Sequence, residues 1–238
     1  MSHSGSVSTS EIAVQVVEGE GLELNALGVP GETTDVILEV EGRELHANRA
    51  VLAHYSPVFE KMFFSRFKES SEARVRLPGK SYKDLVLFFN TLFPRAPDSL
   101  CQISDGNLLM LLTLADEYQA DQVKDRCQDY IGRELYLYFC RFYNYYAVKS
   151  SGSVSTPLKG CNTKGQDLTK PQLIDKLVLY MLACDKFSLP LYKDRVEVLL
   201  IRFCDKFKDL STASHYTALP GATRIVLLEL MCKKLSGW

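Results

Sequence analysis

The stretch EVEGRELHANRAVLAHYSPVFEKMFF, residues 39–64, holds a turn, a short strand and a break inside an apolar pattern of helical spacing. Its Glu-Gly pair at 41–42 joins two short segments, which predicts a tight hairpin. Proline costs about 3 kcal/mol inside a helix, but it is tolerated at the first helical position, and serine is a favoured N-cap. Ser56–Pro57 therefore predicts that one short helix ends near Tyr55 and that a second begins at Ser56.

The segments around this break are predicted to share one hydrophobic core. Val36, Leu38 and Val40 alternate with polar residues, which is typical of a half-buried strand. The two short helices carry apolar residues at helical spacing. We therefore expect Leu52 and Phe59, on the inward faces of the two helices, to be buried in this core.

The rest of the chain is predicted to be mainly helical. A charged loop leads to a short strand at residues 74–77, and Ser81 and Ser104 are each expected to cap a helix. Residues 121–149 are expected to form one or two helices. The segment SSGSVSTPLKGCNTKGQ, residues 150–166, is rich in Ser, Thr and Gly and is predicted to be a linker. Three more helices are predicted after it, at Thr169–Phe187, Pro190–Phe207 and Pro220–Leu235.

A similarity within the chain links residues 114–127, LADEYQADQVKDRC, to residues 183–196, ACDKFSLPLYKDRV. Asp116 aligns with Asp185 and Tyr118 with Phe187, and both copies contain Lys-Asp-Arg. Each copy is predicted to be a helical hairpin. Two explanations stay open: a true duplication, and a pattern that unrelated helical hairpins share.

Composition and charge bound the classes of function. A net charge of −1 implies no general attraction to nucleic acid or anionic lipid. The aromatic run at 136–146 has a spacing that favours core packing over base stacking. The N-terminal residues lack the pattern of a secretory signal, and no apolar run is long enough for a membrane span. The sequence thus predicts neither a nucleic-acid nor a membrane partner.

The reactive side chains form no recognisable catalytic or metal-binding motif. The seven cysteines contain no C-x-x-C pair, and most have apolar neighbours. This indicates reduced, buried thiols and a cytoplasmic or nuclear protein. Phosphate-binding, zinc-protease and serine-hydrolase motifs are absent from the sequence. No catalytic residue, metal or cofactor is therefore predicted, and the protein is not expected to be an enzyme.

Residues 33–132 resemble the BTB (POZ) domain family. The resemblance rests on Asp35-Val36, VEGREL, HANRAVLAHYSPVFEKMF, VRLPG, YKDLVLFFNTLF and NLLMLLTLADEYQADQVKDRC. The chain departs from the family at Asn48–Arg49, where His-Lys or His-Arg is usual, and there it is similar to MATH–BTB-type adaptors. No MATH domain is present in the sequence. The resemblance implies an α+β fold, a small sheet covered by helices, followed by an all-helical, BACK-like domain.

This resemblance, with the composition shifts, predicts five regions along the chain. Residues 33–132 are the BTB/POZ domain, and residues 167–238 are the helical, BACK-like domain. The remaining regions are a partly disordered N-terminal segment (1–32), a connecting aromatic-rich helix (133–149) and the linker (150–166).

The resemblance also implies a function in protein–protein interaction. Family members of this type form homodimers and serve as substrate adaptors for cullin-3 ubiquitin ligases, so the expected partners are a second copy, the cullin-3 scaffold and an unknown client protein. Phe67 and Glu69 match the hydrophobic-x-Glu pattern that docks the cullin, with the alternative of an ordinary loop. Asp35 and Arg49 match charged positions near the dimer interface and its groove, and a purely structural role is the preferred interpretation.

Other functions remain as alternatives. A BTB scaffold or transcriptional co-regulator that never binds a cullin would use the groove at Asp35 and Arg49, without depending on Phe67. An enzyme built on the C-terminal half is disfavoured by only four histidines in the chain and by the lack of paired acids in a recognisable setting. A channel-tetramerisation role is disfavoured because no membrane span follows.

Overall fold

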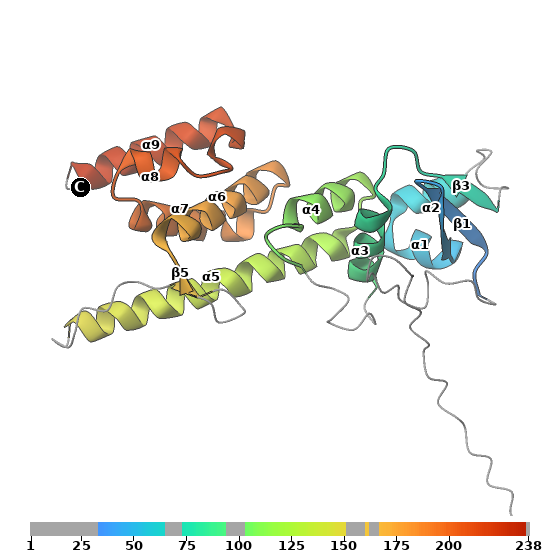
Figure 1. The fold of residues 1–238 in the computed structure, drawn as a ribbon, viewed down its shortest axis with the longest axis horizontal. Helices are drawn as coiled ribbons and strands as arrows, with labels where there is room; N and C mark the ends of the chain where they lie inside the picture. The colour runs from blue at the N-terminus through green and yellow to red at the C-terminus, as the bar shows by residue number, and fades with distance from the viewer. Residues whose placement is uncertain (1–32, 65–72, 94–102, 151–159, 162–166, 237–238) are drawn as a thin grey trace, which may run out of the picture. The chain divides into compact units, whose positions relative to one another are not determined.

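The computed structural model describes residues 33–64, 73–93, 103–150, 160–161 and 167–236, shown in colour in Figure 1. The chain divides into two compact units. Unit 1 holds residues up to 102 together with residues 117–122, and unit 2 holds residues 103–116 and 123–238. The expected α+β class is confirmed, since a small sheet with helices is followed by a helical region.

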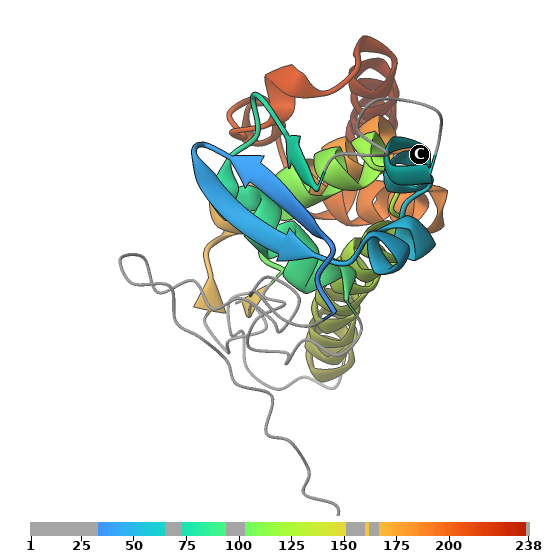
Figure 2. The same cartoon turned by 90° about the vertical axis from the view of Figure 1, so that its right-hand side faces the viewer.

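Unit 1 contains a three-stranded sheet of β1 (Val36–Val40), β2 (Arg43–Ala47) and β3 (Arg74–Arg76), in the order β2-β1-β3. Strands β1 and β2 are antiparallel, whereas β3 runs parallel to β1 (Figure 2). Glu41 and Gly42 turn the hairpin with φ angles of 51° and 73°. Two successive positive φ angles match the twist of the flanking strands, so the predicted hairpin is confirmed.

The two faces of this sheet differ in chemistry, as the alternating sequence requires. Val36, Leu38 and Val40 are almost completely buried. On the other face, Arg74 lies 2.6 Å from a carboxylate oxygen of Glu44. The inner face therefore faces the core, and the outer face carries exposed ion pairs that contribute little to stability.

The break at Ser56 forms as the sequence predicts. Helix α1 (Arg49–Tyr55) ends before it, and helix α2 (Pro57–Phe64) begins after it. The Ser56 hydroxyl accepts a hydrogen bond from the Phe59 backbone N–H at 3.1 Å and donates one to the Tyr118 carbonyl at 2.5 Å. This one side chain caps α2 and also holds a residue that is 62 positions away.

An aromatic cluster forms the core of unit 1. Leu52 and Phe59 are 1% and 0% exposed, which confirms their predicted burial. The Phe59 ring stacks on Tyr118, with 4.6 Å between the ring centres. Helix α3 (Tyr82–Leu92) supplies Phe88 and Phe89, and the Ser81 hydroxyl caps it by accepting from the Asp84 N–H, as expected.

Unit 2 is built from helices that contact one another along the chain. Its contacts include α6 with α7, α7 with α9, and α6 with α8. The helices are α4 (Leu108–Glu117), α5 (Asp121–Ser150), α6 (Lys170–Lys186), α7 (Pro190–Phe203), α8 (Phe207–Ser211), the short 3₁₀ helix η2 (Tyr216–Ala218) and α9 (Gly221–Leu235).

The structure refines several predicted boundaries in this region. Helix α4 begins at Leu108, and a turn links it to Ser104, whose carbonyl accepts the Leu108 backbone N–H, as the carbonyl of an N-cap does. The helix predicted to reach Phe207 ends at Phe203, and Phe207 begins α8. Strand β4 (Gly160–Cys161), inside the predicted linker, pairs antiparallel with β5 (Asp167–Leu168), which follows the linker directly.

A buried ionic cluster joins the turn that precedes α4 to helices α5 and α6. Lys176 and Glu134 are 7% and 0% exposed, and they form an ion pair. Lys176 also lies 3.1 Å from a carboxylate oxygen of Asp105. Burial alone would lower the pKa of Lys176, but its hydrogen bond to Glu134 and the nearby carboxylate hold that pKa above its usual value. The lysine therefore stays charged inside the core.

Three tyrosines complete this cluster. The hydroxyls of Tyr130 and Tyr180 both donate to Asp105 at 2.8 Å. The Tyr138 hydroxyl donates to Glu134 at 3.3 Å, and burial raises the pKa of Tyr138 to about 12. Tyr138 thus belongs to the core, as predicted for the aromatic run, whereas Tyr136 is 68% exposed.

The cysteines agree with the prediction at three described positions and differ at one. Cys127, Cys184 and Cys204 are free and buried, and burial raises their pKa values to about 12, 12 and 11. Such thiols are protonated and poorly nucleophilic. Cys232 is exposed, so the expectation of a buried thiol was wrong there, because α9 turns this residue towards solvent.

Candidate protein-binding surface

Asp35 and Asn48 together cap the N-terminus of α1. The Asp35 carboxylate accepts a hydrogen bond from the Arg49 backbone N–H at 2.7 Å, and the Asn48 side chain accepts one from the Val51 N–H at 3.0 Å. The first N–H groups of a helix lack partners within the helix, and a carboxylate there also complements the helix dipole. Asp35 thus fixes where α1 begins.

Asn48 has a second role that the sequence did not reveal. Its amide NH₂ donates to the Thr33 carbonyl at 2.7 Å, so it joins the start of α1 to the segment before β1. The residue at which the chain departs from the family pattern is therefore both a helix cap and a bridge to a neighbouring segment.

Arg49 lies at the same helix start with its side chain turned towards α2. Its guanidinium carbon is 5.8 Å from the centre of the Phe63 ring, a distance at which cation–π attraction operates. The structure thus brings Asp35 and Arg49 together, through the Arg49 backbone N–H. This contact agrees with the structural interpretation of the pair.

Phe64, at the end of α2, is an exposed aromatic residue that the sequence interpretation did not single out. It is 61% exposed, whereas Phe59 and Phe63 on the same helix are buried. Helical periodicity places it on the outward face with Pro57 and Glu60. The predicted cullin-docking residues Phe67 and Glu69 follow it closely in sequence and lie outside the described residues.

The described residues offer no counterpart of a metal centre or a membrane anchor. Within the described ranges, no group of three or more His, Cys, Asp or Glu side chains is placed to hold a metal ion. None of the helices in that part of the chain has the length and apolar character needed to cross a bilayer. The candidate site described above consists of the capped start of α1 and the exposed Phe64 at the end of α2.

Comparison with known families shows that this surface lies within a recognised domain. The BTB/POZ domain family matches residues 24–135, a range that includes β1–β3 and α1–α4. This chain contains a BTB/POZ domain. BTB/POZ domains are protein–protein interaction modules without catalytic activity of their own. The resemblance predicted from residues 33–132 is confirmed.

Curated relatives combine a BTB domain with other modules. The chain is 29% identical over 98 residues to BTB and MATH domain-containing protein 36 of Caenorhabditis elegans, covering 41% of this chain and 29% of that protein. It is 32% identical over 110 residues to Kelch repeat and BTB domain-containing protein 8 of Xenopus tropicalis, covering 46% of this chain and 18% of that protein.

The similarity to the human Kelch repeat and BTB domain-containing protein 8 is longer. It is 29% identical over 167 residues, 65% of this chain and 27% of that protein, and so extends outside the BTB/POZ match. In each of these three relatives the match spans less than a third of the protein's length.

Proposed function

We propose that this protein is a substrate adaptor of a cullin-3 ubiquitin ligase. In this mechanism the BTB/POZ domain binds the cullin, the helical unit or the N-terminal segment binds a client protein, and a second copy doubles both sites. The observation that supports it is the BTB/POZ domain itself, with relatives named as BTB–MATH and Kelch–BTB proteins.

The geometry of α2 supports a docking surface at its C-terminal end. Phe64 projects from the outward face, and the segment carrying Phe67 and Glu69 begins directly after it. An aromatic side chain that inserts into a partner's pocket, next to a carboxylate that fixes orientation, is a common arrangement at interface hot spots. The proposal assigns the anchor to Phe67 and the orienting charge to Glu69.

Isothermal titration calorimetry with cullin-3 tests this proposal. Loss of an aromatic anchor costs about 2–4 kcal/mol, roughly 30- to 800-fold in affinity. The double variant Phe67→Ala/Glu69→Ala should therefore lose measurable binding while its melting temperature stays near that of the wild type. Phe207→Ala removes an exposed phenyl group from α8 in unit 2 and serves as the matched control, which should bind normally.

The outcomes separate the adaptor from its alternative. A wild-type protein that gives no heat with cullin-3 would reject the adaptor function and favour the scaffold or transcriptional co-regulator. Normal binding by the double variant would show that the docking residues lie elsewhere in the BTB/POZ domain.

The same proposal includes a homodimer. Sedimentation at tens of micromolar, a concentration suited to an ordinary interface, should show a species of twice 26.9 kDa. A species of 26.9 kDa alone would remove the doubling of sites from the mechanism.

Asp35 is assigned a structural role within this proposal. Removing a helix cap of this kind costs about 0.5–2 kcal/mol. Asp35→Ala should therefore lower the melting temperature and leave cullin affinity per folded molecule unchanged, whereas a large loss of affinity at unchanged stability would place Asp35 in a binding groove.

A further inference from the structure

A groove of about 590 Å³ runs between α7 and α9 in unit 2. Its floor is aliphatic: Val198 and Ile201 come from α7, and Leu230 comes from α9. Val198 is 59% exposed, and Leu191, seven residues earlier on the same helical face, is 64% exposed. Two packed helices therefore present a shared apolar stripe of the kind that binds a third helix.

The charges around the groove are separated by sign. Asp194 and Glu197 precede the apolar groove residues along α7, whereas Arg202 and Lys233 lie near the C-terminal ends of α7 and α9. Burial at the groove raises the pKa of Glu197 above its usual value. The groove thus has an acidic end, an apolar centre and a basic end.

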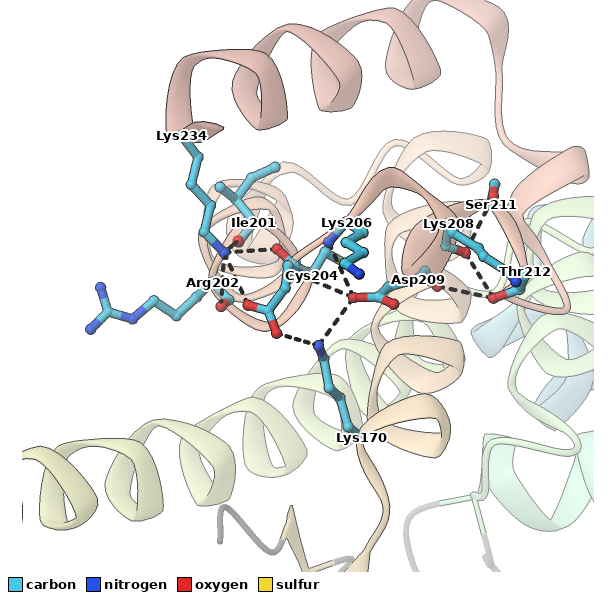
Figure 3. Close-up of polar contacts among 11 residues, drawn as sticks. Lys170, Ile201, Arg202, Cys204, Lys206, Lys208, Asp209, Ser211, Thr212 and Lys234 are labelled. Atoms are coloured by element: carbon cyan, nitrogen blue, oxygen red, sulfur yellow. Dashed lines mark hydrogen bonds and ion pairs between the residues drawn. The ribbon is translucent and has the colours of Figure 1, made fainter. Parts of the chain in front are cut away.

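Lys234 holds the basic end of the groove together. Its ammonium group donates to the carbonyls of Ile201 at 2.9 Å and Cys204 at 2.7 Å, as Figure 3 shows. These are among the last carbonyls of α7, which lack partners within the helix. The contact fixes the end of α9 against the end of α7, so both walls of the groove are formed before any ligand arrives.

The order of the charges that line the groove decides which helix fits and in which direction. Acidic residues near the start and basic residues near the end are the arrangement that stabilises any helix through its dipole. A second helix with this same order meets opposite charges at both ends only when it runs antiparallel to α7. The two helix dipoles also oppose each other favourably in that orientation.

We propose that the α7–α9 groove binds an amphipathic helix of a partner protein, antiparallel to α7. The bound helix carries apolar residues at i, i+3 or i+4 and i+7, acidic residues in its first turn and basic residues in its last turn. This surface lies in unit 2 and does not depend on cullin binding by the BTB/POZ domain.

Fluorescence anisotropy of the full chain with designed peptides tests the proposal. The probe is a labelled helix of about 15 residues with a leucine stripe, glutamates in its first turn and lysines in its last. It should bind with a dissociation constant on the order of 10–100 µM, and a peptide of the same composition with scattered leucines should not bind. Equal binding of both peptides would overturn the proposal.

Two protein variants locate the binding. Val198→Asp places a charge on the groove floor, and Ile225→Asp is the matched control, because Ile225 is 58% exposed on α9 and does not line the groove. Val198→Asp should abolish binding, and Ile225→Asp should leave it unchanged. Normal binding by Val198→Asp would reject this groove as the site.

Direction and charge are tested by a third variant and a spin label. Arg202→Glu/Lys233→Glu should weaken the probe about tenfold, and a peptide with lysines at both ends should recover the affinity. A nitroxide at the peptide C-terminus should broaden amide signals near Asp194 and not those near Lys233. Broadening near Lys233 would reject the antiparallel orientation.

A second copy of this chain is the competing occupant. If Val198→Asp abolished self-association in sedimentation and the peptide failed to compete with it, the groove would be an interface between copies, and the proposal of a partner helix would be overturned.

Discussion

The α4–α5 and α6–α7 hairpins have the same turn in two different environments. In the first, Lys124 pairs with Asp116 at 2.9 Å; in the second, Lys193 pairs with Asp185 at 2.6 Å. The residue in the left-handed region is Gln119 in one turn and Ser188 in the other, with φ angles of 51° and 53°. All these pairs keep the register of the sequence similarity, which therefore reflects a shared local structure.

The two hairpins differ in what covers the turn. The Asp116 side chain is 64% exposed, whereas that of Asp185 is 7% exposed and also accepts a hydrogen bond from the Thr223 hydroxyl of α9. Tyr118, in the first turn, stacks instead on Phe59 of unit 1. Two turns with the same local pattern thus make different contacts: the first packs through the Tyr118 ring, and the second contains the largely buried Lys193–Asp185 ion pair.

The largest effect on stability is expected at Phe59, the aromatic partner of Tyr118 in the α4–α5 turn. Phe59→Ala removes a fully buried ring that stacks on Tyr118, and such a truncation costs about 3–5 kcal/mol. We expect the BTB/POZ domain to unfold or to melt far below the wild type in calorimetry.

Phe64→Ala is the control on the same helix, because Phe64 is 61% exposed. Its effect on the free energy of unfolding should stay within about 0.5 kcal/mol. Equal effects of the two substitutions would show that burial does not distinguish these two positions.

The next effect compares the two ion pairs directly. Lys193→Met removes the ion-pair partner of a nearly buried carboxylate that keeps its hydrogen bond from Thr223. It should cost about 1–2 kcal/mol, a value reduced because Lys193 is itself 38% exposed. Lys124→Met removes a partner of an exposed carboxylate and should cost less than about 0.5 kcal/mol. Urea denaturation of both variants measures the difference, and equal costs would contradict the contrast in burial.

The direction of the pKa shift of Lys193 determines how the Lys193–Asp185 pair depends on pH. The hydrogen bond to Asp185 raises the pKa of Lys193 above its usual value. Its stabilising contribution is therefore complete below about pH 10 and is lost as the pH rises through the raised pKa. The stability difference between wild type and Lys193→Met should shrink at alkaline pH.

A smaller effect tests what the two turns share. A residue with a side chain costs roughly 1–2 kcal/mol in the left-handed backbone conformation relative to the right-handed conformation. Glycine avoids this cost, although it loses more conformational entropy on folding than other residues do. Gln119→Gly and Ser188→Gly should each stabilise the protein by about 0.5–1 kcal/mol. Stabilisation by only one of them would show that the turns are not equivalent.

The smallest effect concerns the exposed ion pairs near the end of α7. A hydrogen bond from Lys170 lowers the pKa values of Asp205 and Asp209 below the usual range. Their contribution is present above about pH 4 and is lost as the pH falls through the lowered values. Carboxyl NMR titration should show both pKa values rising in Lys170→Met, and unchanged values would contradict the contact drawn in Figure 3.

Much of the fold could be predicted because the signals are local. Ser56–Pro57 marked the junction of α1 and α2, and Thr169 marked the start of α6, where its backbone N–H bonds the Gln172 side chain. The end of α7 shows the limit, because one helix was predicted to reach Phe207, whereas α7 ends at Phe203 and α8 begins at Phe207. The Asp209 carboxylate accepts hydrogen bonds from the backbone N–H groups of Asp205 and Lys206 in this break, a contact that depends on the turn that the backbone adopts.

The sequence alone determined most of the helices and strands, the BTB/POZ resemblance and the register of the two hairpins, because caps, turns and apolar periodicity act over a few residues. Only the tertiary structure decided that Lys176 and Glu134, 42 residues apart, form a buried pair, and that Asp185 is covered while Asp116 is not. Segments that are distant in the chain decide how far a charged pair is removed from water. The same local Lys–Asp pattern therefore contributes differently to stability in the two hairpins.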